Sequence, residues 1–238
     1  MNRPRFEILD HVATPWGTLY LRRRELLGRP GTIVTEVMVE HDLLMSSLNT
    51  RSEEELATRA IAWRGGDDAP LRVLVGGLGL GYTAHAALAD PRVSEVLVLE
   101  QEDAVLRWTQ EGLTPLGAEL SAEPRLRAEK GDVYARLLGP AEATWDLILI
   151  DVDHTPTERL AESSAPFYTV EGLRTVAEHL APGGVLAVWS AGDDDAFAAT
   201  MAEAFPRSAR ERVLWVNELL DEGEEIEDVV FLAARPLG

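Results

Sequence analysis

The stretch VLVGGLGLGYTA, Val73 to Ala84, joins an apolar run to a glycine-rich turn. It predicts a buried strand, a tight turn and the start of a helix. The glycines at Gly77, Gly79 and Gly81 have the spacing G-x-G-x-G. Dinucleotide-binding turns have the spacing G-x-G-x-x-G, and Tyr82 stands where their last glycine would be. No G-K-[ST] follows, so the turn favours a ligand that approaches the backbone closely without a pyrophosphate.

Length and composition limit the classes of protein to which the chain can belong. Its 238 residues suffice for one large α/β domain with a small appendage. The net charge of -19 argues against a nucleic-acid partner and favours a cationic small molecule such as an amine. The absence of cysteine excludes thiolate metal sites and a cysteine nucleophile. Without a long apolar run or a signal-peptide pattern, we expect a cytoplasmic protein with no membrane partner.

Residues 1–50 differ in pattern from the rest of the chain. Short β-rich runs such as GTLYLRRRE and TIVTEVMVE, separated by PWG and GRPG turns, predict a small N-terminal β-sheet. Such a segment is too small to bury its own apolar face, so we expect it to serve oligomerisation, most simply in a homodimer. Ser52 and Glu55 form a capping-box pattern, which predicts a helix at the start of a second domain, residues 51–238.

From Leu71 onward, predicted strands alternate with predicted helices. The strand segments include LRVLV, SEVLVLE, RLRAEKGD, WDLILIDVD and GVLAVWS, and the last two are apolar throughout, as parallel strands covered on both faces must be. The segments RVLWVNEL and DVVFLAARP have no helix between them and predict a terminal antiparallel hairpin. The pattern predicts a doubly wound α/β sheet, whose ligands bind beyond the carboxyl ends of the strands.

Acidic residues follow three of these strands in succession. Glu100 ends SEVLVLE, where an acid can accept hydrogen bonds from both hydroxyls of a ribose. Asp132 follows RLRAEKG, where a carboxylate could accept a bond from an adenine amino group. Asp151 and Asp153 close WDLILIDVD. Together with the glycine turn, these acids predict a nucleoside-binding site with additional carboxylates beside it.

At these residues the chain resembles the class I S-adenosylmethionine-dependent methyltransferases. That resemblance covers roughly Leu71 to Pro236 and implies a seven-stranded, Rossmann-like sheet. In that family the G-x-G-x-G turn passes under the methionine part of the cofactor, the second strand's acid meets the ribose, and an aspartate after the third strand meets adenine. The resemblance therefore implies that Gly77, Gly79, Gly81, Glu100 and Asp132 bind S-adenosylmethionine.

A closer resemblance is to the spermidine synthases, which also carry a small β-rich segment before this fold. GGLGLGYTA is similar to their glycine-rich loop, and WDLILIDVDHTP is similar to their catalytic strand end. The segment APFYTVEGLRTVAEHLAPGGVLAV resembles the helix and strand that follow. In that family the strand-end aspartate orients and deprotonates an amine, which displaces methylthioadenosine from a sulfonium. The resemblance assigns this role to Asp151.

The chain departs from the spermidine synthases at several positions. Gly79 replaces the loop acid that holds the amino end of their donor, Val152 alone separates Asp151 from Asp153, and His154 stands where their second acid would be. We therefore predict an S-adenosylmethionine-dependent methyltransferase acting on a small, cationic acceptor. The alternative is a polyamine aminopropyltransferase that uses decarboxylated S-adenosylmethionine, and a second alternative is a non-catalytic protein that binds S-adenosylmethionine.

Several residues have two interpretations at this stage. His154 is either a catalytic base or an ordinary loop residue, and Asp153 either binds a substrate amine or is solvated. Tyr168 either shapes the acceptor pocket or packs at a helix start. Asp151-x-Asp153 also invites a metal site, but no matching ligand pair follows the next strand, so we expect no metal. The remaining candidates for a pocket wall, otherwise core residues, are Trp16, Trp189 and Trp215.

Overall fold

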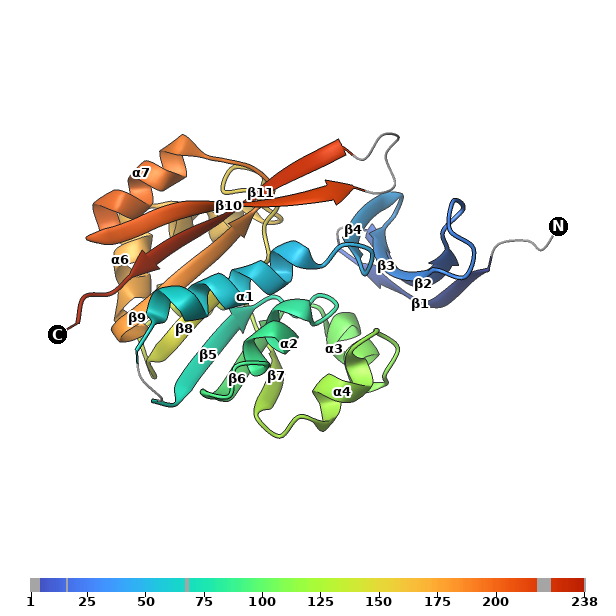
Figure 1. The fold of residues 1–238 in the computed structure, drawn as a ribbon, viewed down its shortest axis with the longest axis horizontal. Helices are drawn as coiled ribbons and strands as arrows, with labels where there is room; N and C mark the ends of the chain where they lie inside the picture. The colour runs from blue at the N-terminus through green and yellow to red at the C-terminus, as the bar shows by residue number, and fades with distance from the viewer. Residues whose placement is uncertain (1–4, 16, 67–68, 218–223, 238) are drawn as a thin grey trace.

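The computed structural model of the chain describes residues 5–15, 17–66, 69–217 and 224–237. An N-terminal antiparallel sheet has the strand order β1-β2-β3-β4 (Figure 1). Its strands are β1 (Phe6–Thr14), β2 (Gly17–Glu25), β3 (Ile33–Val39) and β4 (Asp42–Ser46). The predicted β-rich character of this segment is confirmed. Its boundary as a separate domain at residue 50 stays a prediction.

The main sheet has seven strands in the order β10-β11-β9-β8-β5-β6-β7. The strands β5 to β9 run parallel to one another, and β11 pairs antiparallel with both β9 and β10. The predicted seven-stranded, doubly wound sheet and its terminal hairpin are confirmed. The strands are β5 (Leu71–Gly76), β6 (Val93–Glu100), β7 (Leu126–Lys130), β8 (Trp145–Ile150), β9 (Leu180–Ser190), β10 (Arg207–Asn217) and β11 (Glu224–Ala234).

Helices cover both faces of this sheet, which explains why its central strands are apolar throughout. In β8, Leu147 and Leu149 belong to one core cluster, and Ile148 and Ile150 belong to the other. The first cluster includes residues of α1, α2 and α3, and the second includes residues of α5, α6 and α7. The helices are α1 (Arg51–Arg64), α2 (Tyr82–Leu88), α3 (Asp103–Gln110), α4 (Gly117–Ala122), α5 (Val133–Leu138), η1 (Glu162–Tyr168), α6 (Val170–Glu178) and α7 (Asp195–Ala204).

The capping box predicted at the start of α1 is wrong. The N-cap residue is Thr50, and no side chain caps the helix. The hydroxyl of Ser52 instead donates to Asp228 of β11, and Glu55 pairs with Arg59 at 2.8 Å. A buried tertiary partner therefore takes the hydroxyl that the local pattern assigned to the helix backbone.

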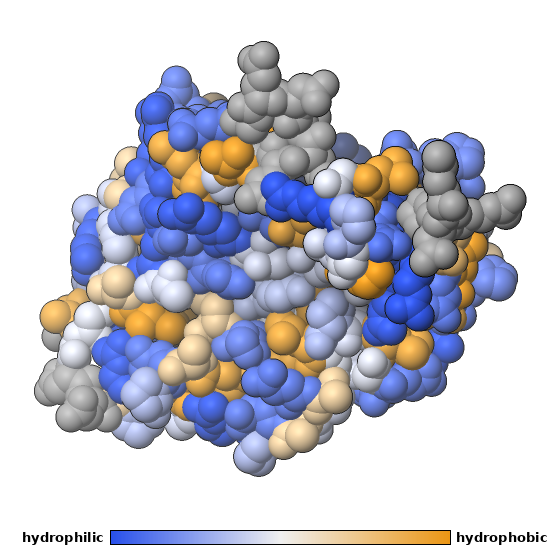
Figure 2. All heavy atoms as spheres, turned by 45° about the vertical axis from the view of Figure 1, so that its right-hand side comes forward, coloured by the Kyte–Doolittle hydropathy of each residue, from blue (hydrophilic) through white to orange (hydrophobic). Residues whose placement is uncertain are grey.

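The N-terminal sheet is anchored to the rest of the chain. Oδ2 of Asp10 accepts hydrogen bonds from Arg107 and from the Trp108 indole, both at 2.6 Å. Leu19 and Leu21 belong to the same core cluster as α2 and α3. Hydrophilic side chains cover most of the face in Figure 2, with apolar ones in small groups. Contacts within the chain thus bury the apolar side of this sheet. We expected a dimer because the sheet alone is too small to bury that side, and this reason no longer supports a dimer.

None of the helices in the described part of the chain has the length and apolar character needed to cross a membrane.

Candidate active site

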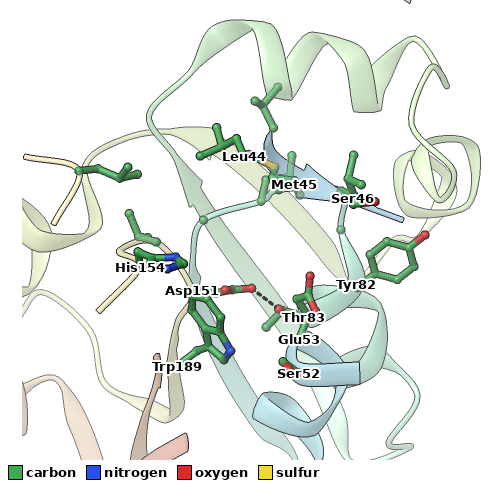
Figure 3. A pocket seen from close by; sticks show the side chains of 18 of the residues that line it. Leu44, Met45, Ser46, Ser52, Glu53, Tyr82, Thr83, Asp151, His154 and Trp189 are labelled. Carbon is green, nitrogen blue, oxygen red and sulfur yellow. Dashed lines mark hydrogen bonds between the residues drawn. The ribbon is translucent and has the colours of Figure 1, made fainter. Parts of the chain in front are cut away.

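A cavity of about 1160 Å³ lies beyond the carboxyl ends of the parallel strands. Leu44, Met45 and Ser46 of β4 lie across this cavity from Asp151 and Trp189 (Figure 3). The N-terminal sheet therefore supplies one wall of the site and the main sheet supplies another. The predicted site residues that line the cavity are Gly77, Gly79, Gly81, Glu100, Asp132, Asp151 and His154.

Backbone geometry explains the glycines of the turn between β5 and α2. Gly77, Gly79 and Gly81 have φ values of 90°, 53° and 96°, which residues other than glycine rarely adopt. A Cβ atom at Gly77 would lie 2.3 Å from the carbonyl oxygen of Asp151, and one at Gly81 would lie 2.3 Å from Leu120. At Gly79 the nearest atom would be Sδ of Met45, at 3.5 Å. The turn is thus tightly packed at Gly77 and Gly81, whereas a Cβ atom at Gly79 would be at an ordinary contact distance from its neighbour.

Glu100 is buried at the end of β6, with 8% of its surface exposed. One oxygen accepts a hydrogen bond from the Leu78 N–H at 2.9 Å, and the other accepts one from the Glu102 N–H at 2.8 Å. Burial raises the pKa of this carboxyl group above its ordinary value. The carboxyl group therefore holds the backbone of the glycine turn through Leu78. Its contact with a ribose stays a prediction.

Asp132 has a structural role that the sequence analysis did not assign. Its Oδ1 accepts hydrogen bonds from the N–H groups of Tyr134 at 2.9 Å and Ala135 at 3.2 Å, and so caps α5. Asp132 also lines the cavity. Because both capping bonds go to Oδ1, a ligand amino group could still bond to Oδ2.

Asp151 follows the last residue of β8 and points into the cavity. Its Oδ2 accepts a hydrogen bond from the Thr83 hydroxyl of α2 at 2.7 Å (Figure 3). Burial raises the pKa of Asp151, and the nearby charge of Asp228 raises it further, while the Thr83 bond acts in the opposite direction. A carboxylate with a raised pKa holds a proton more readily, as a proton acceptor requires.

Asp153 is not among the residues that line the cavity, and its predicted role as a catalytic or amine-binding residue stays a prediction. It is 3% exposed, and its carboxylate accepts hydrogen bonds from Tyr134 Oη at 2.7 Å, Tyr168 Oη at 2.9 Å and the Leu160 N–H at 2.7 Å. These donors fix the loop after β8. Tyr168 packs edge-on against Phe197, so it also serves this loop rather than the pocket.

Aromatic side chains lie in the cavity beside the end of β8. The ring of His154 meets the Trp189 ring edge-on, with 6.1 Å between the centroids. Trp189 and Trp215 both line the cavity, as the pocket interpretation of these tryptophans expected. Trp16 lies outside the described residues. His154 thus lines the same cavity as Asp151, and its role in catalysis stays a prediction.

Two further carboxylates in the cavity were missed by the sequence analysis. Glu53 lies in the first turn of α1, next to Thr83 (Figure 3). Burial raises its pKa to about 8, with a further contribution from the charge of Asp151. Asp228 of β11 is 5% exposed and accepts a hydrogen bond from the Trp215 indole at 2.7 Å. Each lies within electrostatic reach of Asp151, and the three form what we call the acid trio, Glu53, Asp151 and Asp228.

The arginines of the cavity wall are engaged elsewhere. Arg24 pairs with Glu36 at 2.7 Å, and Arg51 pairs with Glu55 at 3.8 Å. Among the described residues, no arginine or lysine forms an ion pair with the acid trio. The trio is therefore suited to a cationic ligand, because buried like charges repel until a cation joins them. No group of three or more His, Asp or Glu side chains in the described ranges is arranged to hold a metal ion.

Comparisons with known proteins agree with this layout. No protein-family model matches the chain. Polyamine aminopropyltransferase 2 of Streptomyces coelicolor is 31% identical over 146 residues, which cover 60% of this chain and 23% of that protein. Putrescine N-methyltransferase 3 of Nicotiana tabacum is 29% identical over 119 residues, which cover 49% of this chain and 29% of that protein. The chain therefore matches less than a third of the length of each of these relatives.

The fold has a solved counterpart. A spermidine synthase in complex with the transition state analogue AdoDATO superposes with a TM-score of 0.71 and 16% identity, over 97% of this chain and 74% of that one. The likeness extends over both sheets, since it covers nearly the whole chain. In sequence this chain is similar to part of a polyamine aminopropyltransferase, and its fold is similar to that of a spermidine synthase.

Proposed function

We propose that this chain transfers the aminopropyl group of decarboxylated S-adenosylmethionine to an amine. The acid trio is the observation that carries this proposal, because it combines a buried proton acceptor with two further carboxylates for a cation. The relatives support aminopropyl transfer over the methyl transfer expected from the sequence, since a polyamine aminopropyltransferase and a spermidine synthase stand among them.

The residues present suit such a donor. The glycine turn allows close approach to its backbone, and Gly77, Gly79, Gly81, Glu100 and Asp132 all line the cavity. The donor supplies a sulfonium, which is already an activated leaving group. The chain's own task is then to hold the acceptor amine in line and to receive its proton.

The acid trio can perform both tasks. An ammonium group entering the cavity binds to the carboxylates, and one carboxyl group of the Asp151–Glu53 pair takes its proton. The neutral nitrogen then forms a bond to the donor carbon while the bond from that carbon to sulfur breaks. Methylthioadenosine leaves with the electron pair of the broken bond. Thr83 holds Asp151 in position through the 2.7 Å hydrogen bond.

Methyl transfer from intact S-adenosylmethionine is the second candidate, and one observation favours it. The decarboxylated donor has a free ammonium group, and an unpaired buried ammonium costs several kcal/mol. The Gly79 position faces the apolar side chain of Met45 instead of offering an acid. The backbone N–H groups of the turn could hold the carboxylate of the intact donor. The putrescine N-methyltransferase among the relatives is consistent with this candidate.

A direct competition between donors tests the proposal. The full chain is incubated with putrescine and either donor, and the products are identified by mass. We expect spermidine from the decarboxylated donor, and loss of this product in Asp151→Asn, which keeps the shape of the side chain but accepts no proton. Methylputrescine formed from the intact donor, with no spermidine from the other, would establish the methyl candidate in its place.

A further inference from the structure

The cavity has an apolar wall as well as an acidic one. Five side chains from four parts of the chain form what we call the apolar wall: Leu160 of the loop after β8, Trp189 of β9, Trp215 and Val216 of β10, and Ile226 of β11. Leu160 is 58% exposed and Val216 is 51% exposed. Isolated exposed apolar residues are common, but several that line one cavity form a surface suited to an apolar ligand group.

The apolar wall is joined directly to the acid trio. Trp215 and Ile226 are cross-strand partners in the hairpin of β10 and β11. Asp228 lies two residues beyond Ile226, so both side chains belong to the same face of β11. The hydrogen bond of 2.7 Å from the Trp215 indole to Asp228 fixes the ring beside the carboxylate. A cation bound at Asp228 therefore has the Trp215 ring and Ile226 next to it.

The volume of the cavity allows a large acceptor. At about 1160 Å³ it exceeds the roughly 300–1,000 Å³ that is usual for small-molecule sites. The glycine turn, Glu100 and Asp132 occupy one part of its lining, and the apolar wall occupies another. A donor bound at the glycine turn therefore leaves the apolar wall to the acceptor.

We infer that the amine site of the cavity also takes amines with an extended apolar body, longer than the chain of putrescine. This inference rests on the proposed function, because it takes the acid trio as the amine-binding site. The amino group binds to the acid trio, and the hydrocarbon part lies along Trp215, Ile226 and Leu160. Each methylene that leaves water on binding contributes to affinity through the hydrophobic effect, and the aromatic faces add dispersion contacts.

A series of linear primary amines tests the inference without turnover. Binding of butylamine, hexylamine and octylamine to the full chain is measured by calorimetry at one pH. We expect the affinity to rise about fourfold per added methylene, the equivalent of ~0.8 kcal/mol. Leu160→Ser and Ile226→Ser should each reduce this dependence on chain length. Leu160 is exposed, so its replacement leaves the core unchanged.

A matched control comes from the same hairpin. Leu214 of β10 is 43% exposed but does not line the cavity, so Leu214→Ser should bind the series like the unchanged chain. Affinities that do not depend on chain length, or that depend on it equally in Leu160→Ser, would overturn the inference even if spermidine is formed. Chain-length-dependent binding without any transfer would instead uphold the inference and contradict the proposed function.

Discussion

At the scale of the residue, we expect the side chain at position 79 to influence whether intact or decarboxylated S-adenosylmethionine binds more tightly. The φ of 53° at Gly79 lies in the left-handed region, which aspartate tolerates better than most residues, and a Cβ atom there has Met45 at 3.5 Å. Gly79→Asp should therefore raise the affinity for decarboxylated S-adenosylmethionine roughly tenfold, because a hydrogen bond to a charged group contributes about 1.5–3 kcal/mol. The affinity for the intact donor should fall, since its carboxylate meets a like charge. Calorimetry with each donor measures both changes.

Gly79→Asn is the control for this substitution. Asparagine has nearly the same shape and the same tolerance of positive φ, but it lacks the charge. If Gly79→Asn changes both affinities as much as Gly79→Asp does, the effect comes from backbone conformation and the electrostatic account of donor choice is refuted.

At the scale of elements, the first turn of α1 places Glu53 against the ends of β8 and β11. Its pKa of about 8 in the folded chain lies above the ordinary value of 4.5. The stability that this group contributes is fully present below pH 4.5 and is lost as the pH rises through about 8. Glu53→Gln removes the titrating group, so the variant should be more stable than the unchanged chain at pH 9, by ~5 kcal/mol, and similar at low pH.

Denaturant unfolding at several pH values measures this difference. The neighbouring Glu54 is exposed in the same turn of α1, and its charge contributes to the raised pKa of Glu53, so Glu54→Gln should shift the pH profile in the same direction as Glu53→Gln but by less. A Glu53→Gln profile that runs parallel to that of the unchanged chain would show that Glu53 titrates alike in the folded and unfolded states.

The parallel strands of the main sheet and the terminal hairpin could be predicted because their signals are local. β8 is apolar on both faces, and the glycine spacing from Gly77 to Gly81 sets the turn that follows β5. The carboxyl ends of parallel strands meet at one edge, so the sequence alone was enough to expect Glu100, Asp132 and Asp151 in a single site. Their common presence in the cavity lining follows from that rule.

The rest of the site depends on contacts between distant parts of the chain. Glu53 has the local pattern of a helix start, and Asp228 follows an acidic stretch that suggests a solvated loop. Only the packing of α1 against β11 brings them to Asp151. Asp153 stands two residues from Asp151, but the hydroxyl groups of Tyr134 and Tyr168 draw it away from the cavity. The spacing of residues in the sequence does not predict such contacts between distant parts of the chain.

At the scale of the whole molecule, the dimer predicted from the sequence needs a different interface from the one first expected. The apolar side of the N-terminal sheet is buried within the chain, but β1 is an edge strand with Phe6 60% and Ile8 52% exposed. We propose that two copies pair along β1, since an exposed edge strand can pair with another chain. Light scattering at micromolar concentration should give the mass of a dimer for the unchanged chain and of a monomer for Ile8→Lys.

Leu27, which follows β2 and is 84% exposed, provides the control. Leu27→Lys adds the same charge away from the edge of β1 and should leave the dimer intact. A monomeric mass for the unchanged chain would end the dimer proposal altogether, and a dimeric mass for Ile8→Lys would move the interface to another surface.

The three glycines of the turn differ in how close a side chain at each position would come to its neighbours. A side chain at Gly77 or Gly81 would meet its neighbour at 2.3 Å, whereas one at Gly79 has 3.5 Å to the nearest atom. Substitution at Gly77 would also displace the carbonyl group of Asp151. The glycine turn and the proposed proton acceptor are therefore structurally coupled at this position. Position 79 alone of the three has room for a Cβ atom at an ordinary contact distance, and its φ of 53° limits the change to residues that tolerate the left-handed region, such as aspartate or asparagine. A single substitution at position 79 could therefore change which form of S-adenosylmethionine the chain binds. The acid trio, which binds the amine in our proposal, would stay the same.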